Sequence, residues 1–473
     1  MLRLFLAIAI VLAIFFRFYD YFDRILVHAD HSLFAQGAIF SAKTLTFPQI
    51  GPFAQSSFFT GPWWLWILGI LYLFPFGVLT PWYFMSIFSL VFIFLIYNIG
   101  REIGGKWLGA VAALFASVSV AQIDNSLALW NAAFDSLAAA IGIYFLIKFY
   151  KQSFSTNITK KTFFIFLLSF IVAVAATIHF QAVLLLPLVL VALVTSRPKL
   201  KYFMVAFLGL LIPFVPFLIF DLRFNWFWIR SVWIFITVDR YRFWVPDRWL
   251  IYAFDYWPQT WGYILGVGKY FGGLIIALVA ILTVVRLRQA RNYKIFYLLA
   301  LSFFLGVVMF RYHVGQRFFY FSNFAHPAVY ILTAWTVVEL YKIKKPLGAL
   351  LGLVIFSLSI RTSFVNLAPK DITFSKITAE KAAIYNKFPN KNFDIYGCSF
   401  SGALVSHPLA LFMYADDRNS QDGEKIGVCF VDNKIDWHVL AAHEVTDKNT
   451  WLNNSTENTY RTMTEWWKTN PPK

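Results

Sequence analysis

The sequence predicts an α-helical polytopic membrane protein with a small α/β domain at its C-terminal end, and three observations support this fold class. Of the 473 residues, 59% are hydrophobic and only 14% are charged, and the mean hydropathy is +0.63. A chain with so little polar surface cannot cover a water-soluble globule, so its solvent is largely lipid. Short basic clusters separate the apolar runs, and the sequence becomes polar beyond residue 361.

About eleven apolar runs approach the length of roughly 20 residues that a membrane-spanning helix needs. Basic residues favour cytoplasmic loops, so the clusters that begin at Arg101, Lys148, Arg197, Arg286 and Lys342 set the direction of the chain. The N-terminus is then expected in the cytoplasm and the C-terminal domain outside. The first run lacks a signal-peptide cleavage site and is expected to stay as a span. The predicted spans are 2–18, 81–98, 107–122, 132–149, 162–179, 182–196, 202–220, 262–285, 295–310, 318–340 and 346–360.

The predicted external side carries three loops, 19–80, 123–131 and 221–261. Long loops in compact proteins are uncommon unless they are functional, which draws attention to the first of them. Within it, the stretch from Gly61 to Phe76 is rich in Trp and Tyr but too short to cross the membrane. We expect it to form a re-entrant or interfacial helix.

Residues 1–361 are expected to form the membrane domain and residues 362–473 a soluble domain outside it. In the soluble domain, Ile377 to Phe388 is patterned as a helix, and Phe393 to Tyr396 and Ile426 to Val431 as strands. The last residues are patterned as a polar helix.

The two cysteines of the chain, Cys398 and Cys429, both lie in this domain. They would pair as a disulfide if the domain is in an oxidising compartment. Two small buried thiols are an equally good interpretation.

The net charge of +17 raises the question of nucleic-acid binding. The basic residues, however, occur as short clusters between apolar runs, as expected for cytoplasmic loops. We therefore expect no nucleic acid among the partners.

Candidate functional side chains gather at the predicted external ends of the spans. Asp30 follows the first span and is flanked by His28 and His31. A metal site there is the less favoured interpretation, because no second group of ligands accompanies these residues. A lone carboxylate at a membrane exit is most often simply solvated.

Further polar residues lie at the neighbouring exits. Asp135 lies about one turn inside a span, close to Asn131, where a charge is costly unless it faces protein or water. His179 sits in a tight turn, and a hydrogen-bonding role there is favoured over that of a base. Asp221 and Arg223 are expected to form a structural ion pair.

Arg311 and Arg317, with His313 between them, break the charge rule by placing cations on the predicted external side. Guanidinium groups bind phosphate in a bidentate manner, so these residues could hold a lipid-linked phosphate. The alternative is that they reach into the lipid headgroups.

Four stretches carry a family pattern: His28-Ala-Asp30 with Ala35-Gln-Gly-Ala, Gly61-Pro-Trp-Trp-Leu-Trp with Gly100-Arg-Glu-Ile-Gly-Gly-Lys, Ala121 to Asp135, and Ile178-His-Phe-Gln with Phe220-Asp-Leu-Arg-Phe-Asn. They resemble the GT-C superfamily of membrane glycosyltransferases, and most closely its bacterial members similar to family 39 and the protein O-mannosyltransferases. The resemblance covers roughly residues 1–340. Two departures from the pattern are that His31 follows Asp30 in place of a second carboxylate, and that Thr60-Gly-Pro stands in place of His-Pro-Pro.

The resemblance implies a GT-C-like membrane domain and an inverting hexosyltransferase of the cell envelope. Such an enzyme moves a sugar from a polyprenyl-phosphate carrier to a protein, lipid or glycan acceptor outside the cytoplasm. Asp30 would be the catalytic base, since it holds the position of the family's first-loop acid. No metal or other cofactor is expected, because the external loops of the membrane part contain no Asp-x-Asp or Asp-Asp pair. The residues expected to bind the substrate or the lipid phosphate are Arg311, Arg317, His313, His179, Asn131 and Asp135.

Two other classes of function remain open from the residues alone. A transporter or lipid flippase would be expected to show internal repeats with matching broken spans, and none is evident. A membrane scaffold whose C-terminal domain binds a partner would tolerate loss of the external polar residues.

Overall fold

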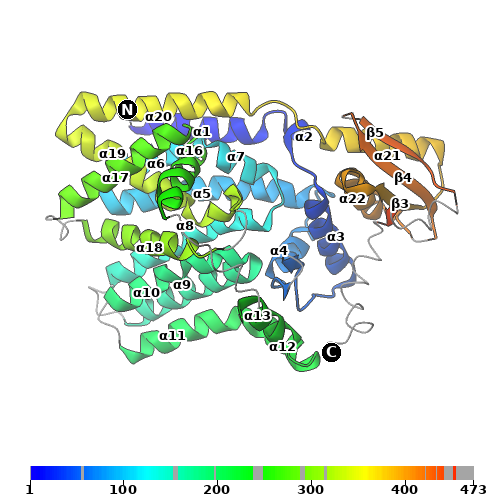
Figure 1. Cartoon of the computed structure of the whole chain (residues 1–473), viewed down its shortest axis with the longest axis horizontal. Helices are drawn as coiled ribbons and strands as arrows, with labels where there is room; N and C mark the ends of the chain where they lie inside the picture. Colours follow the sequence, from blue (N-terminus) through cyan, green and yellow to red (C-terminus); the bar gives the residue numbers. More distant parts are fainter. Residues whose placement is uncertain are drawn as a thin grey trace.

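The structure is a computed structural model and shows a bundle of helices with an α/β unit at one end (Figure 1). The predicted fold class, a helical membrane protein with a small C-terminal α/β unit, is confirmed. One hydrophobic core runs from the bundle into this unit. The residues that the structure describes are 2–54, 58–152, 158–195, 199–237, 249–287, 293–313, 317–420, 422–432, 434–441 and 451–453.

Every predicted span contains helix. Short 3-10 segments, η1 (Asn131–Ala133), η2 (Phe180–Leu185), η3 (Ile212–Phe214) and η6 (Phe319–Ala325), and a π-helical turn, η4 (Tyr252–Tyr256), adjoin the α-helices. The helices of the bundle are α1 (Leu2–Phe18), α5 (Thr80–Gly104), α6 (Lys106–Ser117), α7 (Val120–Leu127), α8 (Phe134–Gln152), α9 (Ile158–Ile178), α10 (Leu186–Thr195), α11 (Leu200–Leu211), α12 (Val215–Arg223), α13 (Phe227–Thr237), α15 (Trp249–Ile251), α16 (Trp257–Leu265), α17 (Lys269–Val285), α18 (Lys294–Phe310), α19 (His326–Ile343) and α20 (Lys345–Val365).

The number of straight crossings is smaller than the sequence pattern suggested. Among the described residues, five helices are long and apolar enough to cross a membrane, or seven if each of two bent pairs is one span. Other predicted spans are shorter helices, such as α18 with 17 residues. Hydropathy finds apolar runs but does not detect where a helix breaks inside one.

The predicted span 107–122 is one of these broken runs. Helices α6 and α7 meet at an angle of 59°. Ser119 caps α7 by accepting a hydrogen bond from the backbone N–H of Gln122 at 3.3 Å. The buried guanidinium of Arg17 donates to the carbonyl of Ser117 at 3.0 Å, satisfying the C-terminal end of α6.

The predicted span 262–285 is likewise not one helix. Helices α16 and α17 are bent by 100° relative to each other. Gly266 and Gly268 have φ angles of 70° and 78°, a left-handed conformation that glycine adopts without steric cost. Apart from Lys269 the run 262–285 is apolar, and its hydropathy alone did not show the turn.

The predicted first external loop, 19–80, is more ordered than a loop where the structure describes it. It contains α2 (Tyr21–Arg24), α3 (Ala29–Thr44), a small hairpin of β1 (Phe53–Ala54) and β2 (Phe58–Phe59), and α4 (Trp63–Leu71). Helix α4 has nine residues and is therefore too short to cross the membrane, as expected of the stretch from Gly61 to Phe76.

The C-terminal unit is a four-stranded sheet with two helices, α21 (Phe374–Lys387) and α22 (Ser399–Ala415). The strands are β3 (Phe393–Cys398), β4 (Glu424–Val431), β5 (Lys434–Val439) and β6 (Trp451–Asn453), in the order β5-β4-β3-β6. Strands β3 and β4 are parallel and are connected through α22, and the other pairs are antiparallel. The predicted helix and the two predicted strands are confirmed, whereas α22 was not anticipated.

Cys398 and Cys429 form a disulfide between the end of β3 and β4. The pairing settles the alternative that the sequence left open. The polar helix expected at the C-terminal end, and residues 238–248 of the loop 221–261, lie outside the described residues.

Candidate active site

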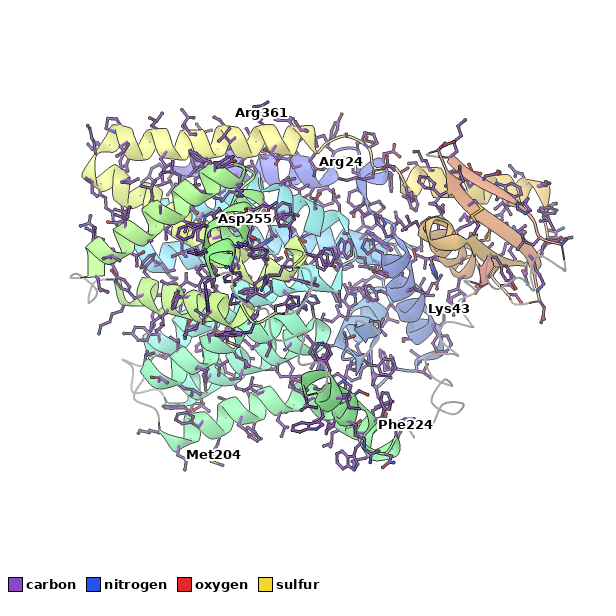
Figure 2. The ribbon with its side chains drawn as sticks, viewed as in Figure 1. Arg24, Lys43, Met204, Phe224, Asp255 and Arg361 are labelled. Carbon is purple, nitrogen blue, oxygen red and sulfur yellow. A yellow bond between two sulfur atoms is a disulfide. The ribbon has the colours of Figure 1, made fainter. Side chains whose placement is uncertain are left out.

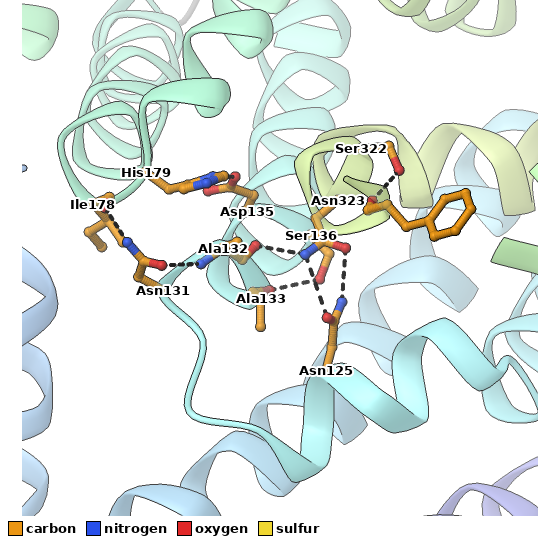
Figure 3. A network of polar contacts seen from close by, with 11 residues as sticks. Asn125, Asn131, Ala132, Ala133, Asp135, Ser136, Ile178, His179, Ser322 and Asn323 are labelled. Carbon is orange, nitrogen blue, oxygen red and sulfur yellow. Dashed lines mark hydrogen bonds and ion pairs between the residues drawn. The ribbon is translucent and has the colours of Figure 1, made fainter. Parts of the chain in front are cut away.

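A network of short polar contacts joins η1, η6 and the ends of α7 and α9 (Figure 3). Asn323, in η6, donates to the carbonyl of Ala132 at 2.9 Å and accepts from Asn125 at 3.1 Å. Asn131 donates to the carbonyl of Ile178 at 3.0 Å and accepts from the N–H of Ala132 at 2.9 Å. These amides hold η1, η6 and the end of α9 together, so the structure places Asn131 in the frame of the site.

Asp135 and His179 form a buried pair within this frame. The Nδ1 atom of His179 lies 2.6 Å from Oδ2 of Asp135, whose side chain is fully buried. The other carboxylate oxygen, Oδ1, has no hydrogen-bond partner within the part of the chain that the structure describes. Figure 3 shows both side chains between α8 and the end of α9. Of the two surroundings that would make a charge at Asp135 tolerable, protein or water, the structure shows a protein partner.

Two neighbouring aromatic residues of η6 connect the two sides of the site. The ring of Phe321 lies 5.8 Å from that of His179 and 5.1 Å from that of His313. The ring of Tyr320 stacks on Trp130 at 5.5 Å and lies within electrostatic range of Asp30. Segment η6 thus stands between Asp30 and the two histidines, which the sequence places about 150 residues or more apart.

Asp30 lies in the first turn of α3, with its side chain exposed to solvent. The helix N-terminus favours a carboxylate at this place. Protein atoms packed beside the group nonetheless raise the pKa of Asp30, because they remove part of the water that solvates its charge. His28 opposes this rise. An accessible carboxylate with a raised pKa is suited to accept a proton.

Of the two histidines that flank Asp30, His31 is held in a structural role. His31 is buried, its Nδ1 lies 2.9 Å from the carbonyl of Leu26, and its ring meets Trp130 edge-on at 4.6 Å. Burial lowers the pKa of His31 to about 3 and also lowers that of His28. Both rings are therefore neutral near pH 7.

No group of three or more His, Cys, Asp or Glu side chains that could hold a metal ion occurs within the described ranges. The metal-free chemistry expected from the sequence stays a prediction.

Arg317 lies against a platform of two tyrosines. Its guanidinium carbon is 5.2 Å from the ring centre of Tyr252 and 5.8 Å from that of Tyr256. One terminal nitrogen donates to the carbonyl of Arg311 at 2.9 Å and to that of His313 at 3.3 Å. Burial lowers the pKa of Arg317, which stays far above neutrality in any case.

Arg311 lies beside this platform, with its guanidinium 5.3 Å from the ring centre of Trp249, and is 5% exposed. The two arginines and His313 therefore lie together, as their spacing suggested. The contacts of the two arginines with Trp249 and with the platform of Tyr252 and Tyr256 were not anticipated. Nothing in the sequence links these three aromatic residues to the loop that carries the arginines.

The expected ion pair of Asp221 with Arg223 is wrong. The two carboxylate oxygens of Asp221 accept hydrogen bonds from the backbone N–H groups of Trp228 and Ile229, at 2.7 and 3.0 Å. Asp221 thus satisfies donors at the beginning of α13, a geometry that depends on a turn the sequence pattern did not show.

Asp124 was among the polar residues that the sequence placed at the third exit, but its two partners were not anticipated. Asn366 donates to Oδ1 of Asp124 at 2.9 Å, and Nζ of Lys370 lies 3.2 Å from Oδ1 of Asn366 and 3.9 Å from the same oxygen of Asp124. Lys370 also lies within electrostatic range of His28. Only the four-residue spacing of Asn366 and Lys370 could have suggested this group.

No protein-family model and no curated protein sequence matches the chain. Solved structures do. One is ArnT from Cupriavidus metallidurans bound to undecaprenyl phosphate, with 13% sequence identity, a TM-score of 0.61 and coverage of 90% of this chain and 92% of that one. Another is the apo oligosaccharyltransferase of Archaeoglobus fulgidus, with 10% identity and a TM-score of 0.56, covering 82% of this chain.

A third is the same archaeal enzyme, AglB, in complex with an inhibitory peptide and a dolichol-phosphate, with 8% identity and a TM-score of 0.53. The chain spans 58% of the length of the archaeal oligosaccharyltransferase. The chain thus shares the fold of ArnT and of the archaeal oligosaccharyltransferase, which confirms the fold expected from the four sequence stretches.

Proposed function

We propose that this protein is a membrane glycosyltransferase that takes a sugar from a polyprenyl-phosphate donor and transfers it to an acceptor on the extracytoplasmic side. The observation that carries the proposal is the position of Asp30, an accessible carboxylate at the N-terminus of α3, across η6 from Arg311 and Arg317 in a chain with the GT-C fold. The undecaprenyl phosphate and dolichol-phosphate in the similar structures support a carrier of this class.

In the proposed reaction, the acceptor hydroxyl gives its proton to Asp30 while its oxygen attacks the anomeric carbon of the sugar. The bond from that carbon to the phosphate oxygen breaks, the electron pair leaves with the phosphate, and the anomeric configuration inverts. Arg311 and Arg317 bind the phosphate and stabilise its growing negative charge.

The remaining residues build this site. His313 and His179 face the same aromatic ring, Phe321, and are proposed to line the donor phosphate, with Asp135 orienting His179 through Nδ1. Asn131 binds backbone in the frame and is proposed to keep the exit of α9 in place. The sugar and the acceptor stay open within this proposal.

The proposed orientation places the α/β unit outside the cytoplasm, beyond a boundary near residue 361. Its disulfide supports this side of the membrane, because disulfides persist in oxidising compartments. The lysine-rich turn between α19 and α20 lies at the opposite end of the bundle in Figure 1, as cytoplasmic loops require.

The decisive test is transfer of labelled sugar from a panel of polyprenyl-phosphate donors by purified protein in lipid nanodiscs. We expect Asp30→Asn to abolish transfer while binding of polyprenyl phosphate is retained, and Asp30→Glu to keep part of the activity. Asp432→Asn, at an exposed turn between β4 and β5, is the matched control and should behave as wild type. Full activity of Asp30→Asn would exclude Asp30 as the base, and absence of transfer from every donor would count against the proposed function.

A further inference from the structure

Helix α3, which carries Asp30, has few large apolar side chains with which to anchor itself. The buried positions of α3 are mostly small or polar, among them Ser32, Ala35, Gln36, Ala38 and Ser41. Small residues allow close approach by neighbours, and α3 is packed between α4 and α22 (Figure 1). The position of Asp30 thus depends on what covers α3.

On the N-terminal side of Asp30, the linker that follows α20 holds α2. The backbone N–H of Lys370 donates to the carbonyl of Asp23 at 3.0 Å. The ring of Phe374, the first residue of α21, lies 5.4 Å from that of Phe22. The same linker supplies Asn366 and the ammonium group of Lys370, which lie beside Asp124 and within electrostatic range of His28.

On the C-terminal side of Asp30, α22 holds α3 over two turns. The amide of Gln36, whose side chain is fully buried, donates to the carbonyl of His407 at 3.3 Å. Nζ of Lys43 lies 2.5 Å from Oδ1 of Asp417 and 3.2 Å from the carbonyl of Tyr414. Figure 2 shows Lys43 at the boundary between α3 and the α/β unit.

The α/β unit can serve as a rigid support because α22 is fixed within it. Helix α22 connects the two parallel strands β3 and β4 and packs against both. The disulfide of Cys398 and Cys429 joins the strand just before α22 to β4. A displacement of the unit would therefore move α22, and with it α3, as one body.

We propose that the C-terminal α/β unit is a positioning part of the active site, which holds the segment that carries Asp30 on both of its sides. Gln36, Lys43 and Lys370 are the positioning residues. This inference rests on the proposed role of Asp30. It assigns a positioning role to the α/β unit, which supplies none of the residues proposed to take part in the reaction. Misplacement of a base by about 1 Å can cost up to about 100-fold in rate, so loosening these contacts should lower turnover without weakening donor binding.

The experiment compares Gln36→Leu, Lys43→Asp and the charge-swapped pair Lys43→Asp/Asp417→Lys. We expect kcat to fall about tenfold in Gln36→Leu and about threefold in Lys43→Asp, while KM and polyprenyl-phosphate affinity change less than twofold. The swapped pair should restore kcat, since it restores the attraction. The matched control is Lys391→Asp, which breaks a 2.5 Å ion pair with Glu424 inside the unit, away from α3, and should leave kcat unchanged.

A second measurement separates this inference from the proposed function. The rate at which a maleimide labels Asp30→Cys should change at least threefold when Gln36→Leu is added, and less than twofold when Lys391→Asp is added. The native cysteines are paired and do not react. Unchanged labelling and unchanged kcat in Gln36→Leu would overturn the inference even if transfer occurs, whereas a changed labelling rate without transfer from any donor would overturn the proposed function alone.

Discussion

At the scale of single residues, the sequence identified polar groups at membrane exits but not their partners. Asp135 was recognisable because a carboxylate inside an apolar run needs a partner, and the structure supplies His179 at 2.6 Å. The stacking of Tyr320 on Trp130 beside Asp30 joins residues from two exits far apart in the chain. Such contacts depend on how helices pack, which no local pattern encodes.

The raised pKa of Asp30 predicts the direction in which the rate of transfer changes with pH. A base acts when deprotonated, so kcat/KM should rise with pH through the raised pKa and reach a plateau above it. The midpoint should lie above the value of about 4 that a free aspartate has. A profile of transfer rate against pH, with Asp432→Asn as control, measures this midpoint. A midpoint at or below that of free aspartate would argue against Asp30 as the base.

The raised pKa of Asp30 also predicts that removal of its negative charge does not destabilise the folded protein. Ionised Asp30 is disfavoured in the folded state, so its pKa is higher there than in the unfolded chain. Protonated Asp30 therefore contributes to the stability of the folded protein at pH values below the pKa that Asp30 has in the unfolded chain. This contribution is lost as the pH rises through the higher pKa that Asp30 has in the folded protein. Near pH 7, Asp30→Asn should therefore have a Tm at or above that of wild type in a thermal unfolding measurement. A clear drop in Tm would indicate a structural role for this carboxylate instead.

The buried pair of His179 and Asp135 predicts an asymmetry between two substitutions. His179→Ala leaves the fully buried carboxylate of Asp135 without its partner and should cost about 3 kcal/mol of stability. Asp135→Asn keeps an oxygen that can accept from Nδ1 and should cost less than half of that. Thermal unfolding of both variants in the same detergent checks the order, and equal losses would mean that the pair does not stabilise the site.

At the scale of elements, the hydropathy of the sequence predicted where helices occur but not where they break. The hydropathy of the run 262–285 did not show the 100° turn between α16 and α17, although Gly266, Gly268 and Lys269 mark its place in the sequence. The turn is possible because Gly262 and Gly272 let the two helices meet backbone to backbone. A Cβ atom on Gly272 would lie 2.4 Å from the carbonyl oxygen of Pro258.

This packing predicts opposite effects for two adjacent glycines of α17. Gly272→Ala forces the helices apart and should destabilise the protein by about 1–3 kcal/mol. Gly273→Ala meets only the side chain of Pro258, at 3.4 Å, and should be neutral or stabilise the helix by up to about 1 kcal/mol. Thermal unfolding of the two variants is a direct comparison. Similar behaviour of both would contradict the close approach.

At the scale of the whole molecule, the division of the chain was evident from the polarity beyond residue 361, but the attachment of the two parts was not. The buried residues of α3 are mostly small or polar. In the sequence, this composition is the same as that of an ordinary external loop. The structure reveals the interface between α3 and α22, in which the side chain of Gln36 is fully buried. The boundary near residue 361 and the direction of the spans stay predictions, and protease protection of sealed vesicles would test them.

The disulfide offers a test of the α/β unit as a whole. It closes a loop with a sequence separation of 31 residues, for which the loss of unfolded-chain entropy corresponds to about 3.7 kcal/mol. The paired variant Cys398→Ser/Cys429→Ser should unfold at lower temperature than the oxidised wild type. Reduced wild type should match the variant, and a reducing agent should not affect the variant. A variant as stable as the oxidised protein would mean that the bond contributes nothing.

The contact between α3 and α22 also orders events during synthesis. Gln36 and His407 are 371 residues apart in the chain, so the first external segment is made long before its cover exists. At translation rates of about 5–20 residues per second, it waits roughly 20 to 75 seconds while the bundle inserts. Throughout that interval the nascent protein lacks the contact between α3 and α22, which forms only after Ser399–Ala415 has been made.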